Sequence, residues 1–387
     1  MTESSPLPRA DGPPTPRLVS KAFGTPRMLS IEAVLRKRLI ICVGAGGVGK
    51  TTSAAALGLT AARHARRAAV ITVDPARRLK DALGLSALSI DPHPVRLEGG
   101  TQFDALALDT KRAFDAVIER FAPSPAVAAR IQANRLYQEL ATGLAGSAEY
   151  MAMEKLHELL HAHRYQLVVV DTPPSAHARD LLAAPSRLTN LLASRAVSLL
   201  QAPVNLLSGT SGVGRMALST LLKALQRWTG LDLLNDLSDF VTAFEDMIEG
   251  FTLRAEEVSR LLKAPTTAFV LVTTPEPHTV ETTIGFHREL TEGGFPVAGI
   301  IANRVLAFPR LDDAAQVLLE LDAPLRAKLL RNYGDICELS RRDRHALKRL
   351  HDETKAPLLA VVPAASEAPT SLSGLERFAT LLVPASA

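Results

Sequence analysis

The segment Leu39-Ile-Ile-Cys-Val-Gly44-Ala-Gly-Gly-Val-Gly49-Lys50-Thr51-Thr52 decides the fold. An apolar run is followed by a glycine-rich loop and then by an Ala-rich stretch of helical character. Buried strand, glycine loop and helix in this order match the phosphate-binding pattern GxxxxGK[ST]. The alternative is a glycine-rich turn with a chance Lys-Thr pair, and the complete pattern in its required context argues against it.

The loop supplies the groups that bind a phosphate chain. Glycines let consecutive backbone N–H groups point inward, and the helix N-terminus adds a favourable dipole. Lys50 is predicted to act as the catalytic cation on the β- and γ-phosphates, and the Thr51 hydroxyl to bind Mg²⁺. The sequence thus predicts an ATPase with ATP and Mg²⁺ as cofactors. The predicted nucleotide-binding residues of the loop are Gly44, Ala45, Gly46, Gly47, Val48, Gly49, Lys50, Thr51 and Thr52.

Two strand-end carboxylates complete the expected site. Val168-Val-Val-Asp171 is an apolar strand ending in a carboxylate, which is predicted to hold Mg²⁺ through water; taken alone, an ordinary strand terminator explains it as well. Asp74 ends the strand-like run before Pro75 and is a candidate to orient the attacking water. Asp before Pro is also a helix N-cap with Pro in the first turn, and the two roles are compatible.

Short apolar runs alternate with helical stretches, which is typical of a parallel sheet covered by helices. The predicted fold class is therefore α/β, with a doubly wound, mainly parallel sheet. Residues 31–387 are expected to form one domain, with a helical subdomain inserted at about 181–262. Strands are predicted at Leu39–Val43, Ala69–Val73, Ala105–Leu108, Gln166–Val170, Thr267–Thr273, Val297–Ala302 and Leu358–Val362. Helices are predicted at Lys50–His64, Thr110–Phe121, Ala148–Ala162, His278–Glu292, Leu311–Leu330 and Ser371–Leu382.

Composition narrows the function classes. The chain has 387 residues, 47% of them hydrophobic, and a formal net charge of +4. Its arginines are scattered, without a long basic block interleaved with aromatics, so no nucleic-acid partner is expected. Residues 1–30 are rich in Pro, Ser, Thr and Gly and are predicted to be a disordered tail without the apolar core of a signal peptide. The two cysteines, Cys42 and Cys337, form no CxxC motif, which predicts no zinc and a reducing, cytoplasmic setting.

The ordered motifs resemble those of the ArsA family, which includes arsenite-efflux ATPases and ATPases that target tail-anchored membrane proteins. This family belongs to the deviant Walker A group with MinD, ParA and the nitrogenase iron protein, and the resemblance runs from Leu39 to the C-terminus. It implies that Asp74 is the catalytic switch I aspartate, and that Asn303 reads adenine. It further implies switch roles for Asp81, Pro174 and His177 and base-contacting loops at Pro275, Glu276 and Pro363. Taken singly, Asn303 and His177 also fit turn and packing roles.

The departures from the family pattern are specific. Ala45 replaces a signature lysine that family dimers place on the partner's nucleotide, and Arg77 and Arg78 stand where switch I usually has His or Asn. We hypothesise that Arg77 or Arg78 substitutes for that lysine. In the alternative, both arginines are solvated and a partner subunit carries the lysine. The cysteines that bind zinc or arsenite in family members are missing.

The resemblance implies a dimer, homomeric or with a related ATPase subunit, whose nucleotide cycle handles a protein client or a membrane-protein partner. One rival function is the energy-coupling subunit of an anion pump. The missing cysteines argue against arsenite as the transported anion. A second is a regulatory switch like MinD or ParA, which does not need the large helical insertion. A third, a small-molecule ligase or kinase on the same loop, lacks a separate acceptor site in the sequence.

Overall fold

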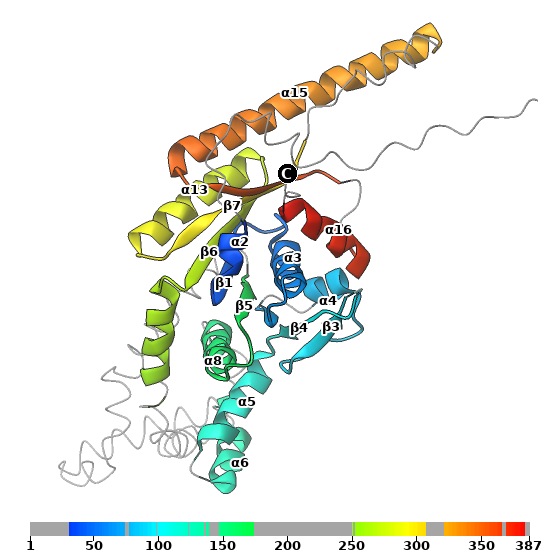
Figure 1. Cartoon of the computed structure of the whole chain (residues 1–387). Helices are drawn as coiled ribbons and strands as arrows, with labels where there is room; N and C mark the ends of the chain where they lie inside the picture. Colours follow the sequence, from blue (N-terminus) through cyan, green and yellow to red (C-terminus); the bar gives the residue numbers. More distant parts are fainter. Residues whose placement is uncertain are drawn as a thin grey trace, which may run out of the picture.

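Eight strands form one sheet in the computed structural model (Figure 1). Their order is β3-β4-β2-β5-β1-β6-β7-β8, and each neighbouring pair is parallel except β3 with β4. The predicted doubly wound, mainly parallel sheet is confirmed. The strands are β1 Leu39–Val43, β2 Ala68–Thr72, β3 His93–Arg96, β4 Gln102–Ala107, β5 Leu167–Asp171, β6 Thr267–Thr273, β7 Val297–Val305 and β8 Leu358–Pro363. The structure describes residues 31–73, 77–97, 99–122, 124–134, 137–138, 147–173, 250, 252–306, 321–365 and 369–383.

Helices cover both faces of the sheet (Figure 1). They are α2 Ile31–Leu35, α3 Lys50–Arg63, α4 Arg77–Leu83, α5 Thr110–Phe121, α6 Pro125–Ala133, α8 Ser147–His161, α13 Pro277–Glu292, α15 Ala323–Thr354 and α16 Leu372–Leu382. A further helix spans residues 252–263. Of the predicted insertion at 181–262, residues 181–249 lie outside the described part of the chain, and its last stretch is helical.

Strand β1 shows how the two faces are built. Its side chains point alternately to opposite sides, as in any strand. Ile40 and Cys42 pack with α3 and α16, whereas Leu39, Ile41 and Val43 pack with α8, α13 and α15. All five residues are buried, which explains the uninterrupted apolar run in the sequence. The strand is therefore fixed from both sides, and so is the point where the glycine loop begins.

One predicted element needs correction, and several observed elements were not predicted. The helix predicted at Leu311–Leu330 is wrong in its limits: residues 321–322 are not helical, α15 begins at Ala323 and it continues to Thr354. Residues 311–320 lie outside the described part of the chain. Strand β3 was not predicted, because its four residues include Pro94 and bury only Val95. The helices α2 and α6 were also absent from the predicted set, and α4 was expected only as the helix that Asp74-Pro75 would start; the remaining predicted elements agree to within a few residues.

Helix α15 projects from the body of the molecule (Figure 1). It carries five of the six large apolar side chains that are exposed in the described residues, which are Leu325, Leu329, Leu330, Ile336 and Leu339. Apolar exposure is thus concentrated on this helix. Within the described part of the chain, no helix is both long enough and apolar enough to cross a membrane.

Candidate nucleotide site

The site lies where the direction of the strand order changes. On one side of β1 the sheet continues with β6, β7 and β8, in chain order. On the other side it continues with β5, β2, β4 and β3. Ligands of open α/β sheets bind outside the carboxyl ends of the strands at such a point. The register places Cys42 of β1 and Thr72 of β2 opposite Asp171 of β5, so the ends of these three strands meet at one edge.

Two glycines of the loop are required by its geometry. A Cβ on Gly44 would lie 2.1 Å from the Val272 carbonyl oxygen of β6. Gly49 has φ +99°, and a Cβ there would lie 2.3 Å from Asn303 Nδ2. Helix α3 begins directly after Gly49, and no side chain of the described residues caps this end. The loop and the helix N-terminus therefore form a backbone cradle suited to an anion.

Lys50 lies over this cradle. Its residue is 5% exposed, and its Nζ donates hydrogen bonds to the carbonyls of Gly44 at 3.1 Å and Ala45 at 2.8 Å. Both carbonyls belong to the loop, so the ammonium group is folded back onto the position predicted for the phosphates. Ala45 itself is buried, whereas Gly46 and Gly47 are exposed. The loop is thus closed beneath by apolar packing and open at its glycine tip.

Asp171 ends β5 beside the loop and is fully buried. Its Oδ2 accepts a hydrogen bond from Thr72 Oγ1 at 2.9 Å. Burial and the nearby Asp171 charge raise the pKa of the Cys42 thiol, while Lys50 opposes this shift. Cys42 is therefore an inert core thiol flanked by both charges of the site. The oxygen donors of Thr51 and Asp171 are hard ligands of the kind Mg²⁺ prefers, so these residues fit the predicted ion.

Asn303 joins the second half of the chain to the loop. It lies in β7, is 6% exposed, and donates from Nδ2 to the Val48 carbonyl at 2.9 Å. The backbone N–H of Arg304 donates to its Oδ1 at 2.9 Å, which fixes the amide orientation. The adenine contact stays a prediction, and the structure adds a loop-supporting role that the sequence did not indicate.

The other predicted base-contacting residues lie at the same edge of the sheet. Pro275 and Glu276 follow β6, and Pro363 ends β8, which runs parallel to β7. Glu276 is the exposed N-cap residue of α13, and its carboxylate accepts a hydrogen bond from Thr274 Oγ1. These positions are compatible with base contact, which stays a prediction.

The switch residues are only partly described. Asp74, Pro174 and His177 lie outside the described residues, so their roles stay predictions. Helix α4 begins at Arg77, as expected for a helix starting after Asp74-Pro75. Arg78 and Asp81 of this helix are exposed, and a carboxylate oxygen of Asp81 lies 4.0 Å from Lys80 Nζ.

Thr72 is a site residue that the sequence analysis missed. It is the last residue of β2 and is 1% exposed. A hydroxyl at the carboxyl end of an otherwise apolar strand was the available signal. Its importance depends on β2 pairing with β5, which local sequence does not reveal.

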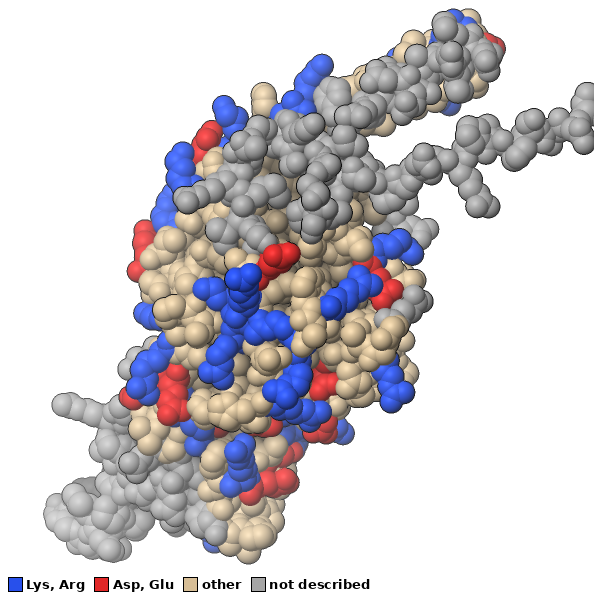
Figure 2. Space-filling view, viewed as in Figure 1, with Lys and Arg blue, Asp and Glu red and all other residues tan. Residues whose placement is uncertain are grey.

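On the face shown in Figure 2, the basic side chains of the described residues are not separated from the acidic ones. Lys and Arg side chains are spread over the visible face, with Asp and Glu side chains among them (Figure 2). The expectation that the protein has no nucleic-acid partner rests on the sequence pattern and stays a prediction.

A glycine cradle after the central strand, a buried lysine over it and a carboxylate on the adjacent strand define a P-loop ATPase. The model of the ArsA family, described as anion-transporting ATPase, matches residues 37–321, and the chain belongs to this family. ATPase GET3 of Malassezia globosa is 27% identical over 274 residues, covering 70% of this chain and 73% of that protein. ATPase get3 of Aspergillus terreus is 26% identical over 286 residues, covering 74% and 78%. The uncharacterized protein SCO2128 of Streptomyces coelicolor is 35% identical over 156 residues, about 40% of this chain and 39% of that protein.

Proposed function

We propose that ATP binding and hydrolysis at this site drive a conformational cycle of a dimer that handles a protein client or a membrane partner. One observation carries the proposal: Asp171 and Asn303, from distant parts of the chain, lie at the phosphate loop that contains Lys50. A loop supported in this way can respond to nucleotide and transmit the response to several elements of the sheet.

The chemistry follows from the residues around the loop. Lys50 neutralises charge that develops on the phosphates, and the backbone N–H groups of the loop hold the chain in place. Asp74 orients the attacking water and accepts its proton. Thr51 and Asp171 would hold Mg²⁺, which would supply positive charge to the phosphates. Asn303 and the loops at Pro275 and Pro363 position the base.

Coupling starts at the end of β5. Thr172 Oγ1 donates to the Cys42 carbonyl at 2.8 Å, so the segment entering switch II is attached to the strand that carries the loop. Departure of the γ-phosphate releases Asp74 and the segment around Pro174 and His177. The helical insertion at about 181–262 then moves and changes the client surface. We place this cycle in a homodimer in the cytoplasm, where free, buried cysteines are stable.

An anion pump is the second candidate, and the description of the family model favours it. Arsenite requires soft thiolate ligands. The two cysteines are buried in different elements, Cys42 in β1 and Cys337 in α15. Neither offers an exposed thiolate, so client handling is the better supported function.

Capture of the client tests the proposal. Asp74→Asn protein is loaded with ATP and its co-purifying chains are identified by mass spectrometry, with Lys50→Ala protein as the nucleotide-free control. We expect specific chains with the first variant and their loss with the second. Identical sets of chains, or ATP turnover stimulated by arsenite or antimonite, would favour the pump.

A further inference from the structure

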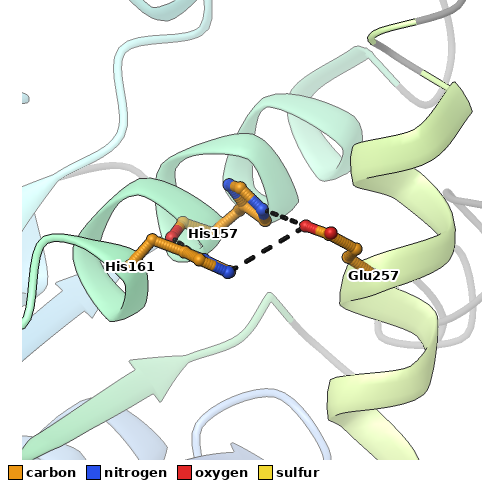
Figure 3. A group of neighbouring side chains, drawn as sticks. All are labelled: His157, His161 and Glu257. Carbon is orange, nitrogen blue, oxygen red and sulfur yellow. Dashed lines mark hydrogen bonds and ion pairs between the residues drawn. The ribbon is translucent and has the colours of Figure 1, made fainter.

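Two histidines and a glutamate meet at the edge of the sheet opposite the nucleotide site (Figure 3). His157 and His161 lie one turn apart on α8, and Glu257 lies on the helix 252–263. The cavity beside them, of about 360 Å³, is also lined by Arg38 and Ala264, which precede β1 and β6. The cluster is therefore at the amino ends of the strands and takes no part in phosphate binding.

The donor atoms are close enough to share one ion. All three lie within 4.8 Å of one another. Glu257 Oε2 is 2.7 Å from His157 Nε2 and 4.0 Å from His161 Nε2. Two ligands of a tetrahedral zinc ion, each bound at about 2.0–2.1 Å, lie about 3.3 Å apart. The observed separations fall on either side of that value, so small side-chain rotations suffice.

The hydrogen bond of His161 shows which of its two ring nitrogens carries the proton and which keeps a lone pair. Its Nδ1 lies 2.9 Å from the His157 carbonyl oxygen, which can only accept, so Nδ1 carries the proton. In the neutral ring, Nε2 therefore presents a lone pair towards the Glu257 carboxylate (Figure 3). Two electron-rich atoms facing each other suit a cation between them. A backbone carbonyl on the opposite ring nitrogen is the usual orientation of a metal-bound histidine.

The frame of the cluster does not depend on a metal. One turn earlier on both helices, the half-buried Arg254 forms an ion pair with the buried Glu154. The Arg254 guanidinium also lies 3.8 Å from the centre of the Phe121 ring. The rings of His157 and His161 stack at 3.9 Å. The ligands are thus held on helices that are already locked together, which lowers the entropic cost of binding.

We propose that His157, His161 and Glu257 bind a divalent transition metal ion of the zinc class, with water from the cavity as fourth ligand. The expectation of no zinc rested on the cysteines, and these histidines lie outside that reasoning. For the ion to bind at His157 Nε2, the proton between this atom and Glu257 must leave: an imidazolium releases it to solvent, whereas in a neutral ring the proton moves to Nδ1. The site fastens α8, which leads into β5, to the helix that leads into β6.

Cobalt titration tests the site. The full-length chain, freed of any histidine tag and of nucleotide, is titrated with Co²⁺ and followed by visible absorption, then with Zn²⁺ in competition. We expect one Co²⁺ per chain with the spectrum of a tetrahedral site. His161→Gln and Glu257→Gln should each weaken binding at least about tenfold. The matched control is His163→Gln, which changes a histidine of the same cavity outside the cluster and should retain wild-type affinity.

A second readout separates a metal site from a simple helix contact. Zn²⁺ should raise the melting temperature of the wild-type chain and of His163→Gln, but not that of His161→Gln, since a ligand stabilises only a state that binds it. His161→Gln leaves the His157–Glu257 hydrogen bond in place, so its melting temperature without metal should be unchanged. Absence of saturable Co²⁺ binding, or equal binding by all variants, overturns the proposal.

Discussion

Asn303 Nδ2 donates a hydrogen bond to the carbonyl oxygen of Val48, 255 residues earlier in the chain. The bond ties β7 to the phosphate loop at the residue before Gly49. Asn303 is thus placed to influence both the loop and the base, and its substitution distinguishes the two effects.

Asn303→Ala should leave the buried Val48 carbonyl without this donor and lower the free energy of unfolding by about 1–3 kcal/mol. ATP affinity should fall about tenfold, equivalent to about 1.4 kcal/mol. Chemical denaturation and ATP titration measure the two quantities. Asn332→Ala, on the exposed face of α15, is the matched control and should change neither. If the variant loses stability but binds ATP and GTP as the wild type does, Asn303 supports the loop without reading the base.

Lys50→Ala should lower ATP turnover by at least about 10²–10³-fold, because a preorganised charge at the phosphates is removed. The circular dichroism spectrum should be unchanged, since the lysine contacts loop carbonyls and not the apolar core. Lys348→Ala, an exposed lysine of α15, provides the control. Parental turnover in the Lys50 variant would contradict the assignment of this loop as the phosphate-binding site.

The parts of this fold that could be predicted are those determined by short stretches of sequence. Strand β1 and its loop combine an apolar run, buried on both faces, with a motif contained in a few residues. Most of helix α15, beyond Leu330, escaped prediction because its polar, highly charged sequence has a long exposed portion that needs no apolar stripe. Contacts such as Thr72–Asp171 and His157–Glu257 join residues 99 and 100 positions apart. They depend on strand order and helix packing, which a single sequence does not specify.

Thr72→Val should expose the role of the strand-end hydroxyl. The fully buried Asp171 carboxylate loses a donor, so the free energy of unfolding should fall by about 1–3 kcal/mol. The Mg²⁺ concentration for half-maximal turnover should rise, because the carboxylate is no longer oriented. The control is Thr60→Val, a buried threonine whose hydroxyl donates to a carbonyl of its own helix. Equal Mg²⁺ dependence in both variants would show that the Thr72 hydroxyl does not orient Asp171 for the ion.

Asp74→Asn separates catalysis from helix capping, because Asn caps a helix about as well as Asp. A catalytic Asp74 predicts near-normal ATP binding with turnover reduced about 10²–10⁴-fold. A cap alone predicts parental turnover. Asp109→Asn is the matched control, since Asp109 caps α5 by accepting from the Arg112 N–H. Single-turnover hydrolysis with bound ATP gives the comparison directly.

The final prediction concerns the two arginines that follow Asp74. Helix α4 begins at Arg77, so Arg77 and Arg78 occupy its first turn, where a cation opposes the helix dipole. An anion such as the transferring phosphate offsets that cost. Ala45 removes the lysine expected to contribute a cation, and phosphoryl transfer benefits from an arginine supplied in cis or in trans. We expect Arg77→Ala or Arg78→Ala to reduce turnover about 10³-fold while ATP affinity is retained.

The measurement is steady-state turnover and ATP affinity for both single variants and for the double variant. Arg67→Ala, at an exposed arginine after α3, controls for a general loss of positive charge. A rate effect confined to one arginine identifies the residue that substitutes for the missing lysine, since only the residue that reaches the phosphate lowers the barrier. Parental turnover in all three variants would show that both arginines are solvated, and that the missing cation comes from a partner subunit.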